Sequence, residues 1–526
     1  MKILVSDPLA EEGLEILRKE KDIEVEVAVK LPLEELKEKI KDAEALIIRS
    51  GTKVTRDLIN AAKNLKVVGR AGVGVDNVDV EAATENGIIV MNSPGANTIS
   101  TAEHTVALLL ALSRNIPHAY ISLKEGKWDR KRFMGVEVHG KVLGIVGLGR
   151  IGGEVAKRVQ ALGMQTIACD PFLSPEAAKR WKVELVEMKD LLRRSDYITV
   201  HTPFTEETKH LIGSKEFALM KDEVRIINCA RGGIIDEKAL YEAMKSGKVA
   251  GAALDVYEEE PPNKNPLLEL DNLVLTPHIG AATKEAQRNV AIEIAHQIVD
   301  VLKGRTIRNA VNVPSIEPEA YEEIKPYFGL AEKLGRLQSQ LLKGRILAVR
   351  VRYSGEIINY DLAPITTAIL KGLLEPILKE AVNYVNAPVI AKEREISVTE
   401  TTSDTLEDFA SLISLEVKST QDKGSVSGTL FSRRDPRIVR LDGFHVDAVP
   451  RGYMLIASHE DKPGIIGKLG TLLGDGGINI AAMTLGRKAK GGNELTVLNL
   501  DGSVSEKILK DIEEIKEILQ VRLAKL

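Results

Sequence analysis

Hydrophobic and polar positions alternate over the first 97 residues in a way that predicts strands and helices in turn. Amphipathic segments such as residues 33–40 have the spacing of a helix with one buried face. They separate short apolar runs with the length of buried strands, at residues 2–5, 23–29, 45–49, 67–70 and 88–91. Because strands joined by helices lie parallel, this region predicts a flavodoxin-like α/β domain with helices on both faces of its sheet.

A second region of alternating strands and helices covers residues 98–281 and predicts a Rossmann-type domain. The motif GLGRIG at 147–152 lies between an apolar run at 141–146 and a predicted helix at 153–162. Further strands are expected at 164–168, 197–201, 224–228, 251–255 and 273–276. A long helix over 282–303 should return to the first domain, which places the active site between the lobes, outside the carboxyl ends of the strands. We therefore predict one discontinuous substrate-binding domain, 1–97 with 282–313, and a second domain at 98–281.

The glycine-rich motif is typical of dinucleotide binding in this context. Its glycines allow a tight turn, the approach of a pyrophosphate to a helix N-terminus, and close packing of helix on strand. Asp170 follows the next strand, where a carboxylate binds ribose hydroxyls and repels a 2′-phosphate. This favours NAD over NADP. A glycine-rich turn without a ligand is the alternative, and the agreement of strand, helix and acidic residue argues against it.

Two further modules are predicted after the proline-rich, charged stretch NVPSIEPEAYEEIKP. Residues 314–450 have the pattern of a mixed α/β domain without a catalytic constellation. Its helices are expected at 328–342 and 365–378, and its strands at 347–353, 437–441 and 444–449. Residues 451–526 follow the order β-α-β-β-α from Tyr453, which is ferredoxin-like.

Composition narrows the class of protein. A chain of 526 residues is too long for one hydrophobic core, and a formal net charge of −4 without a long basic run argues against a nucleic-acid partner. The chain opens without a signal-peptide pattern, and its longest apolar helical run, 105–112, is too short to span a bilayer. We therefore expect a cytoplasmic protein without a membrane partner. Cys169 and Cys229 suit a reducing compartment, and no His or Cys spacing indicates a metal site.

Three polar residues downstream of the glycine motif carry candidate chemistry: Arg231 in NCARGG, Glu260 in YEEEPP and His278 in TPHIGAAT. A histidine paired with a carboxylate can accept the proton of a substrate hydroxyl, and an arginine fork can hold a carboxylate. The pattern predicts hydride transfer to or from a 2-hydroxy acid. Other polar residues nearby are expected to be structural or solvated, namely His104, His139, His201, Glu258 and Glu259.

The blocks NCARGGIIDEKAL, ALDVYEEEPP and LVLTPHIGAAT resemble the signatures of the D-isomer-specific 2-hydroxyacid dehydrogenases. With the chain length, RAGVGVDNVD, SPGANTISTAEH and GKWDRKRFMG are similar to the long-chain members, which oxidise D-3-phosphoglycerate to 3-phosphohydroxypyruvate in serine biosynthesis. HEDKPG and GDGGINI resemble an ACT domain, and residues 314–450 then correspond to the allosteric substrate-binding domain of those members. One departure is Val73, where some members carry a polar residue.

The resemblance implies roles for particular residues. Arg231, Glu260 and His278 would be catalytic, with Glu260 fixing the tautomer of His278 and raising its pKa. Contacts with NAD are implied for Gly147, Gly149, Arg150, Ile151, Gly152, Asp170, Thr202, Cys229, Ala230, Arg231, Asp255, His278, Gly280 and Ala281, with Asp255 at the nicotinamide carboxamide. Contacts with the small-molecule substrate are implied for Arg49, Arg70, Gly74, Asn97, Thr98 and Arg231, with Asn97 and Thr98 at the interdomain hinge.

The resemblance also implies partners. In related enzymes the positions of His459, Asp461 and Asn479 bind L-serine between paired ACT domains, so serine is the expected effector. A packing module that has lost its effector is the alternative. GKWDRKRFMG carries Trp128 among basic residues and reaches a neighbouring subunit in the family, so we expect a homodimer or homotetramer rather than an exposed loop.

Two alternative activities stay open. One is another dehydrogenase of the superfamily, such as a glyoxylate or hydroxypyruvate reductase, which the two C-terminal modules disfavour. The other is a non-enzymatic NAD-dependent scaffold, which the intact set of Arg231, Glu260 and His278 disfavours.

Overall fold

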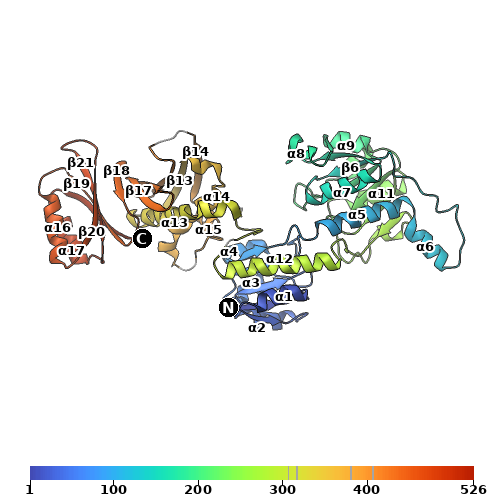
Figure 1. The fold of residues 1–526 in the computed structure, drawn as a ribbon, viewed down its shortest axis with the longest axis horizontal. Helices are drawn as coiled ribbons and strands as arrows, with labels where there is room; N and C mark the ends of the chain where they lie inside the picture. Colours follow the sequence, from blue (N-terminus) through green and yellow to red (C-terminus); the bar gives the residue numbers. More distant parts are fainter. Residues whose placement is uncertain (306, 315–317, 380–381, 405–407) are drawn as a thin grey trace.

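The computed structural model describes residues 1–305, 307–314, 318–379, 382–404 and 408–526. Figure 1 shows three bodies along its long axis. The first lobe, in blue, lies between a second lobe, in cyan and green, and the C-terminal modules, in yellow to red.

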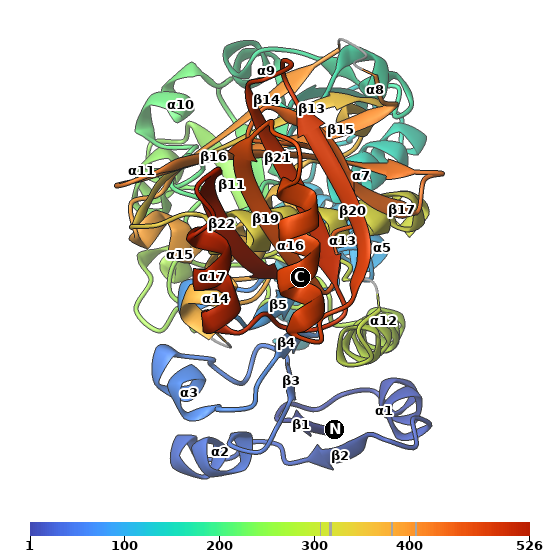
Figure 2. The same ribbon diagram turned by 90° about the vertical axis from the view of Figure 1, so that its left-hand side faces the viewer.

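The first lobe is a five-stranded parallel sheet in the order β2-β1-β3-β4-β5, which confirms the flavodoxin-like prediction. Helix α12 (Lys284–Leu302) returns to this sheet and buries Ile294 and Ile298 in its core. A Cβ on Gly69 would lie 2.9 Å from both side chains, so glycine lets the helix close on the sheet (Figure 2). The other elements are β1 (Lys2–Val5), α1 (Glu11–Arg18), β2 (Glu24–Val27), α2 (Leu33–Ile40), β3 (Ala45–Ile48), α3 (Arg56–Ala61), β4 (Val67–Arg70), α4 (Val80–Glu85) and β5 (Ile89–Met91).

The second lobe is a seven-stranded parallel sheet in the order β12-β11-β10-β9-β6-β7-β8, the doubly wound order that the Rossmann prediction requires. Its strands are β6 (Val142–Val146), β7 (Gln165–Cys169), β8 (Glu184–Leu185), β9 (Tyr197–Val200), β10 (Val224–Asn228), β11 (Val249–Leu254) and β12 (Leu273–Leu275). Its helices are α5 (Thr98–Ser113), α6 (Ile116–Lys124), α7 (Arg150–Ala161), α8 (Pro175–Lys179), α9 (Met188–Arg194), α10 (Ser214–Leu219) and α11 (Glu237–Lys245), with a short 3-10 turn at Pro266–Glu269.

One predicted boundary in this lobe is wrong. Helix α7 begins at Arg150 and not at residue 153, because Gly149 is extended and its carbonyl accepts the Gly153 amide at 2.9 Å. The last residues of the glycine motif therefore form the first turn of the helix.

The intervening module places helices against a six-stranded sheet in the order β14-β13-β15-β16-β17-β18. Helix α13 (Pro318–Leu341) starts ten residues before the predicted start at 328 and runs through Pro326. The other elements are β13 (Ile346–Gly355), a 3-10 turn (Glu356–Asn359), α14 (Ala363–Leu378), α15 (Ala387–Glu393), β14 (Ser397–Ser403), β15 (Ser411–Ser419), β16 (Lys423–Phe431), β17 (Asp435–Leu441) and β18 (Phe444–Ala448).

The last module is a ferredoxin-like sheet in the order β20-β21-β19-β22. The sequence prediction ended on a helix, but the chain adds the edge strand β22 (Ile518–Lys525). The remaining elements are β19 (Tyr453–Glu460), α16 (Ile465–Asp475), β20 (Ile480–Arg487), β21 (Asn493–Leu500) and α17 (Glu506–Glu513). Residues such as Met454 and Ile456 share one hydrophobic cluster with α13, so the two C-terminal modules have a common core.

The segment that contains Ala310 and Asn312, called the strap below, joins the first lobe to the C-terminal modules. Ala310 pairs with Met91 at the free edge of β5, and the Asn312 amide reaches the main chain of Ile88 and Val90. From the intervening module, Asn383 donates to the Gly87 carbonyl at 2.9 Å. Gly87 and Ile88 lie in the turn between α4 and β5, whereas Val90 and Met91 lie in β5 itself.

No single helix among the described residues combines the length and apolar character needed to cross a membrane. Helices α5 and α6 meet the length and composition criteria only when taken together, and they are bent by 63° at their junction.

Candidate active site

Three loops meet at the carboxyl edge of the second sheet and bring the predicted catalytic residues together. Arg231 follows β10, Glu260 follows β11 and His278 follows β12. Because these strands are parallel neighbours, their carboxyl ends lie at one edge. The three side chains line a cavity of about 430 Å³, and Asp76 of the first lobe contributes to its wall. The cavity lies where the two lobes face each other.

His278 and Glu260 form a hydrogen-bonded pair, with 2.8 Å between Nδ1 and Oε2. The bond to Glu260 raises the pKa of His278, although burial acts in the other direction. Burial would raise the pKa of Glu260, but the bond and charge of His278 outweigh burial, so this pKa is lowered. Because Nδ1 is engaged by the carboxylate, Nε2 is the nitrogen that remains for a substrate hydroxyl.

The backbone of His278 is strained. Its φ of 52° lies in the left-handed region, which costs a residue with a Cβ about 1 to 2 kcal/mol. Such positions persist where the surrounding structure holds them, and they concentrate at functional sites.

Asp255 holds the loop that carries His278. This buried carboxylate accepts hydrogen bonds from the Thr276 hydroxyl at 2.6 Å and from the amides of Ile279 and Gly280 at 2.8 Å. Its Oδ1 also lies 3.2 Å from Nε2 of His104. Burial would raise the pKa of Asp255, but these hydrogen bonds lower it. His104, which we expected to be structural, therefore has a carboxylate partner that the sequence did not indicate, and contact of Asp255 with the nicotinamide carboxamide stays a prediction.

Arg231 links the two lobes. Its Nε lies 3.3 Å from Asp76 Oδ2, and its Nη1 donates to the Ala230 carbonyl at 2.7 Å. Asn228 holds the Arg231 carbonyl at 2.9 Å. A Cβ on Gly74 would lie 2.3 Å from Nη2 of Arg231, so the guanidinium lies directly against the Gly74 backbone.

The other two predicted substrate arginines differ in position. Burial lowers the pKa of Arg70 to about 10, and the charge of Arg231 adds to this effect, so these cations are neighbours. Arg49 is not among the described residues that line the cavity of Arg231 and His278, and it lines two other cavities instead. Its backbone amide donates to Asp7 at 2.6 Å.

The glycine motif has the shape of a dinucleotide-binding loop. Gly147 has a φ of 92°, and a Cβ there would lie 2.7 Å from the His201 carbonyl. Gly149 is the N-cap residue of α7 and has open space where a Cβ would point, as the approach of a pyrophosphate requires. Asp170 accepts from the Leu148 amide at 2.9 Å, which ties the acidic residue to the loop.

Buried polar atoms without a hydrogen-bond partner gather at predicted ligand positions. Within the described chain they include Arg70 Nε, Asn97 Oδ1, Thr98 Oγ1 and Thr202 Oγ1. An unsatisfied buried group costs about 1 to 3 kcal/mol, so these atoms fit a bound dinucleotide and substrate between the lobes. The Cys229 side chain does not fit, because it is buried and burial raises its pKa to about 12. Any contact of Cys229 with the cofactor must come from its backbone.

Comparisons with known proteins match the chain from end to end. The family model for the NAD binding domain of D-isomer specific 2-hydroxyacid dehydrogenases matches residues 106–280. The model for the D-3-phosphoglycerate dehydrogenase intervening domain matches 323–442, and that for the ACT domain matches 453–517. The D-3-phosphoglycerate dehydrogenase of Methanocaldococcus jannaschii is 52% identical over 100% of both chains. The chain belongs to the D-3-phosphoglycerate dehydrogenase family.

Other family members and solved structures agree. The D-3-phosphoglycerate dehydrogenase of Bacillus subtilis is 44% identical over 99% of both chains. The D-lactate dehydrogenase of Aquifex aeolicus, solved with NAD and lactic acid, is 29% identical with a TM-score of 0.54, covering 60% of this chain and 100% of that one. A glyoxylate reductase from Paecilomyes thermophila is 34% identical with a TM-score of 0.55, covering 59% of this chain and 98% of that one. The second lobe is therefore an NAD-binding domain of this family.

The predicted effector residues of the ACT domain do not lie together in one chain. Asp461 follows the end of β19 and accepts from Arg487 and from the Gly491 amide, both at 2.9 Å. Asn479 precedes β20 at the other end of the sheet, where it donates to Asp501 at 2.6 Å. His459 is 1% exposed, and its ring nitrogens contact the Glu460 carbonyl and the Thr496 hydroxyl. Both nitrogens thus have partners inside the domain, and a contact of His459 with an effector stays a prediction.

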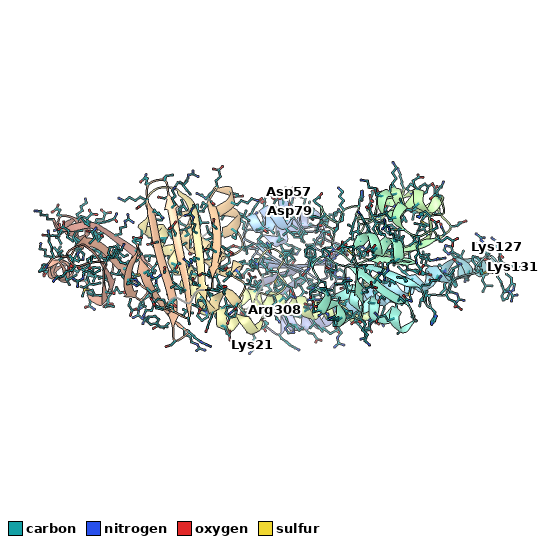
Figure 3. All side chains as sticks on the ribbon, turned by 90° about the horizontal axis from the view of Figure 1, so that it is seen from above. Lys21, Asp57, Asp79, Lys127, Lys131 and Arg308 are labelled. Carbon is teal, nitrogen blue, oxygen red and sulfur yellow. The ribbon has the colours of Figure 1, made fainter. Side chains whose placement is uncertain are left out.

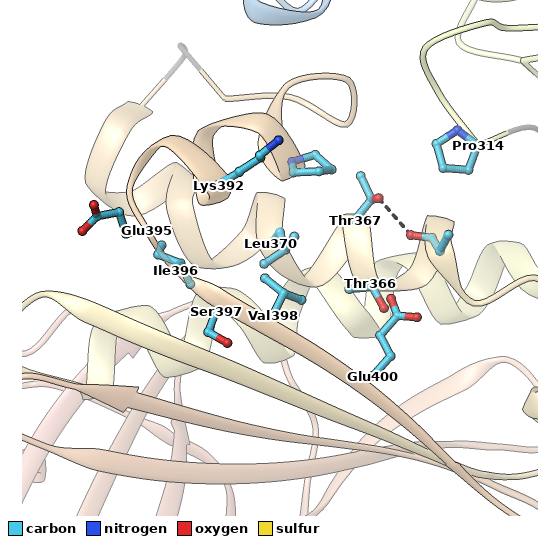
Figure 4. Close-up of a pocket in the computed structure, with 12 residues that line it drawn as sticks. Pro314, Thr366, Thr367, Leu370, Lys392, Glu395, Ile396, Ser397, Val398 and Glu400 are labelled. Atoms are coloured by element: carbon cyan, nitrogen blue, oxygen red, sulfur yellow. Dashed lines mark hydrogen bonds between the residues drawn. The ribbon is translucent and has the colours of Figure 1, made fainter. Parts of the chain in front are cut away.

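A separate cavity of about 550 Å³ lies in the intervening module between α14, α15 and β14 (Figure 4). Of the described residues that line it, Lys392 is the single cation, whereas Glu395 and Glu400 are carboxylates. This lining does not favour an anion such as a phosphorylated substrate.

Sequence reasoning missed a second histidine in the catalytic cavity. His210 lies 3.1 Å from Glu258, a residue that we expected to be only solvated. The two residues come from different loops, and the acidic run YEEEPP was the one visible signal.

Proposed function

We propose that this enzyme oxidises D-3-phosphoglycerate to 3-phosphohydroxypyruvate with NAD, the first step of phosphorylated serine synthesis. The His278–Glu260 pair at 2.8 Å, in one cavity with Arg231, carries the proposal. The relatives that match the whole chain, C-terminal modules included, bear the name D-3-phosphoglycerate dehydrogenase.

The chain's own groups divide the work. His278 removes the proton from the C2 hydroxyl through Nε2, and Glu260 stabilises the resulting imidazolium. Arg231 holds the substrate carboxylate and C2 oxygen with its fork, and the Gly74 backbone closes the same side. The phosphate meets Arg70 and Arg49, which extend the positive charge into the first lobe.

NAD would be held by the glycine loop at α7, by Asp170 at the adenosine ribose and by Thr202 near the lobe interface. The chemistry that bound NAD would supply is an acceptor for the hydride that leaves C2. Asn97 and Thr98 lie at the start of α5, between the lobes, where an approach of the lobes would exclude water from the cavity.

A glyoxylate or hydroxypyruvate reductase is the competing activity, since a glyoxylate reductase matches the first two lobes. The formation of NADH with D-3-phosphoglycerate, compared with unphosphorylated D-glycerate, separates the two. Preference for the phosphorylated acid supports the proposal, and equal use of both acids contradicts it. A protein that binds NAD and oxidises neither acid would be the scaffold.

We also propose that L-serine binds between two ACT domains and inhibits the enzyme. Asp461 and Asn479 lie at opposite ends of the same sheet, so one small ligand can touch both only if they come from different chains. The carboxylate can accept from the amino group, and the amide can hold the acid end.

We propose that subunits assemble through residues 116–135, called the arm below, which begin with α6. Figure 3 shows Lys127 and Lys131 at the far end of the molecule, on this arm. Tyr120 is 64% exposed, Trp128 78% and Met134 80%, and large apolar side chains on one extension favour burial against a second copy. We propose that the enzyme is a homodimer or homotetramer and that it is cytoplasmic. We also propose that its domains end at residues 97, 281, 313 and 450, with 282–313 returning to the first domain.

A further inference from the structure

The catalytic cavity contains a second histidine–carboxylate pair. His210 lies in the loop between β9 and α10, and its Nε2 is 3.1 Å from Oε1 of Glu258. Glu258 is two residues before Glu260 in the chain, and both residues line the cavity. Glu258 therefore shares the loop of Glu260, whereas His210 comes from a different loop of the same cavity.

Glu258 exchanges two hydrogen bonds with Glu237. Its Oε1 also accepts the Glu237 backbone amide at 3.1 Å, and its own amide donates to Oε1 of Glu237 at 2.7 Å. Glu237 forms the first turn of α11, which packs in the core of the second lobe. His210 thus connects a loop at the cavity rim to a segment that is fastened to the core.

The same segment sets the position of Glu260. The Tyr257 amide donates to Oε1 of Glu260 at 3.2 Å, while Oε2 binds His278. A Cβ on Gly232 would lie 1.8 Å from the Tyr257 carbonyl oxygen, so the backbone of residues 257–260 is in close contact with the loop that carries Arg231. The His210 amide donates to the Gly233 carbonyl at 2.7 Å, which ties the loop of His210 to that of Arg231 as well.

We propose that His210 and Glu258 are positioning residues that hold the segment 257–260 so that Glu260 aligns His278. The inference rests on the proposed function. His210 does not itself take the substrate proton, because its nitrogens face carboxylates: Nε2 faces Glu258, and Nδ1 lies 3.9 Å from Asp236. Among the described residues, these two carboxylates are the acidic groups within 4.0 Å of the ring nitrogens.

The test compares four single variants of the full-length enzyme. His210→Asn removes the reach to Glu258 and suits the φ of 50°, since asparagine tolerates the left-handed region. Glu258→Ala removes the acceptor, and Glu258→Gln keeps an acceptor oxygen. Glu259→Ala is the matched control, because this exposed neighbour shows no hydrogen bond or ion pair in the described structure. Circular dichroism melts check that each variant is folded.

We expect His210→Asn and Glu258→Ala each to lower kcat with D-3-phosphoglycerate about 3- to 10-fold, the worth of one such hydrogen bond. The KM for NAD should not change, and the acid limb of the pH profile should move to lower pH because His278 is less well paired. Glu258→Gln should retain most of the activity. The double variant, His210→Asn with Glu258→Ala, should lose no more than the worse single variant.

The proposal would be overturned if His210→Asn and Glu258→Ala lowered kcat no more than Glu259→Ala does. It would also be overturned if the fold-loss of kcat in the double variant equalled the product of the two single fold-losses. A loss above about 100-fold in His210→Asn with an active His278→Ala would overturn it as well, because it would make His210 the proton acceptor. If the wild type oxidises D-glycerate and not D-3-phosphoglycerate, the proposed function fails, and the same variants assayed with D-glycerate still decide the role of the pair.

Discussion

The substitution Glu260→Gln tests the proton relay most directly. It keeps the shape and one acceptor oxygen of the side chain but removes the charge that faces Nδ1 of His278 at 2.8 Å. A hydrogen bond between charged partners is worth about 1.5 to 3 kcal/mol. The side chains of His278 and Glu260 are 52% and 39% exposed, so solvent reduces this value. We therefore expect a loss of about 1 kcal/mol in the transition state, or roughly fivefold in kcat.

The direction of the pH effect follows from the raised pKa of His278. Oxidation needs neutral His278, so the rate rises with pH as the imidazolium loses its proton. Without the negative partner the imidazolium is less stable, and the pKa of His278 falls. The acid limb of kcat/KM should therefore move to lower pH, while the plateau falls.

Initial rates of NADH formation over a range of pH measure both effects. His278→Ala is the comparison, with a loss of about 100- to 10,000-fold in kcat and little change in NAD affinity. An acid limb that stays in place, or that moves to higher pH, in Glu260→Gln would refute the reasoning. Wild-type turnover in His278→Ala would refute the assignment of the base.

Three further predictions concern cofactor, assembly and regulation. Asp170→Asn should weaken NAD binding and reduce the preference for NAD over NADP by about tenfold, because the repulsion of a 2′-phosphate is lost. Equal use of NAD and NADP by the wild type would contradict this prediction. Trp128→Glu should shift the oligomer toward monomer in light scattering at micromolar concentration, whereas a monomeric wild type would exclude the proposed arm contact. Asn479→Ala should abolish inhibition by serine with little change in uninhibited kcat, and a wild type that neither binds serine nor is inhibited by it would leave the ACT module structural.

That the three candidate catalytic residues lie together could be predicted from the sequence for a topological reason. Arg231, Glu260 and His278 each follow a short apolar run, and neighbouring parallel strands bring such positions to one edge. The same argument applies to the glycine motif, because its helix must begin where the strand ends. Local pattern was enough where the chemistry lies at strand ends.

Contacts between loops could not be predicted in this way. His104 and Asp255 meet because α5 crosses the sheet near the end of β11, and the sequence holds no local sign of that contact. His210 and Glu258 likewise come from two loops that are far apart in the sequence. The resemblance to an ACT domain likewise did not indicate that β19 ends at Glu460 and that the imidazole of His459 is buried. The helix α13 was cut short in the prediction because Pro326 normally ends a helix.

The strap between the lobes and the C-terminal modules supports a last prediction. The Asn312 side chain accepts from the Val90 amide at 2.8 Å and donates to the Ile88 carbonyl at 2.8 Å and the Thr84 hydroxyl at 3.0 Å. It therefore satisfies two main-chain groups at the edge of β5 that a truncated side chain would leave unpaired.

An unsatisfied buried polar group costs about 1 to 3 kcal/mol, and partial access of water reduces this at a sheet edge. Asn312→Ala should therefore destabilise the first lobe by about 2 kcal/mol, with faster hydrogen exchange at Val90. Asn64→Ala, which removes one exposed bond to the Lys41 carbonyl, is the control and should cost less than about 1 kcal/mol. Equal stability of the two variants in chemical denaturation would show that the strap does not hold β5.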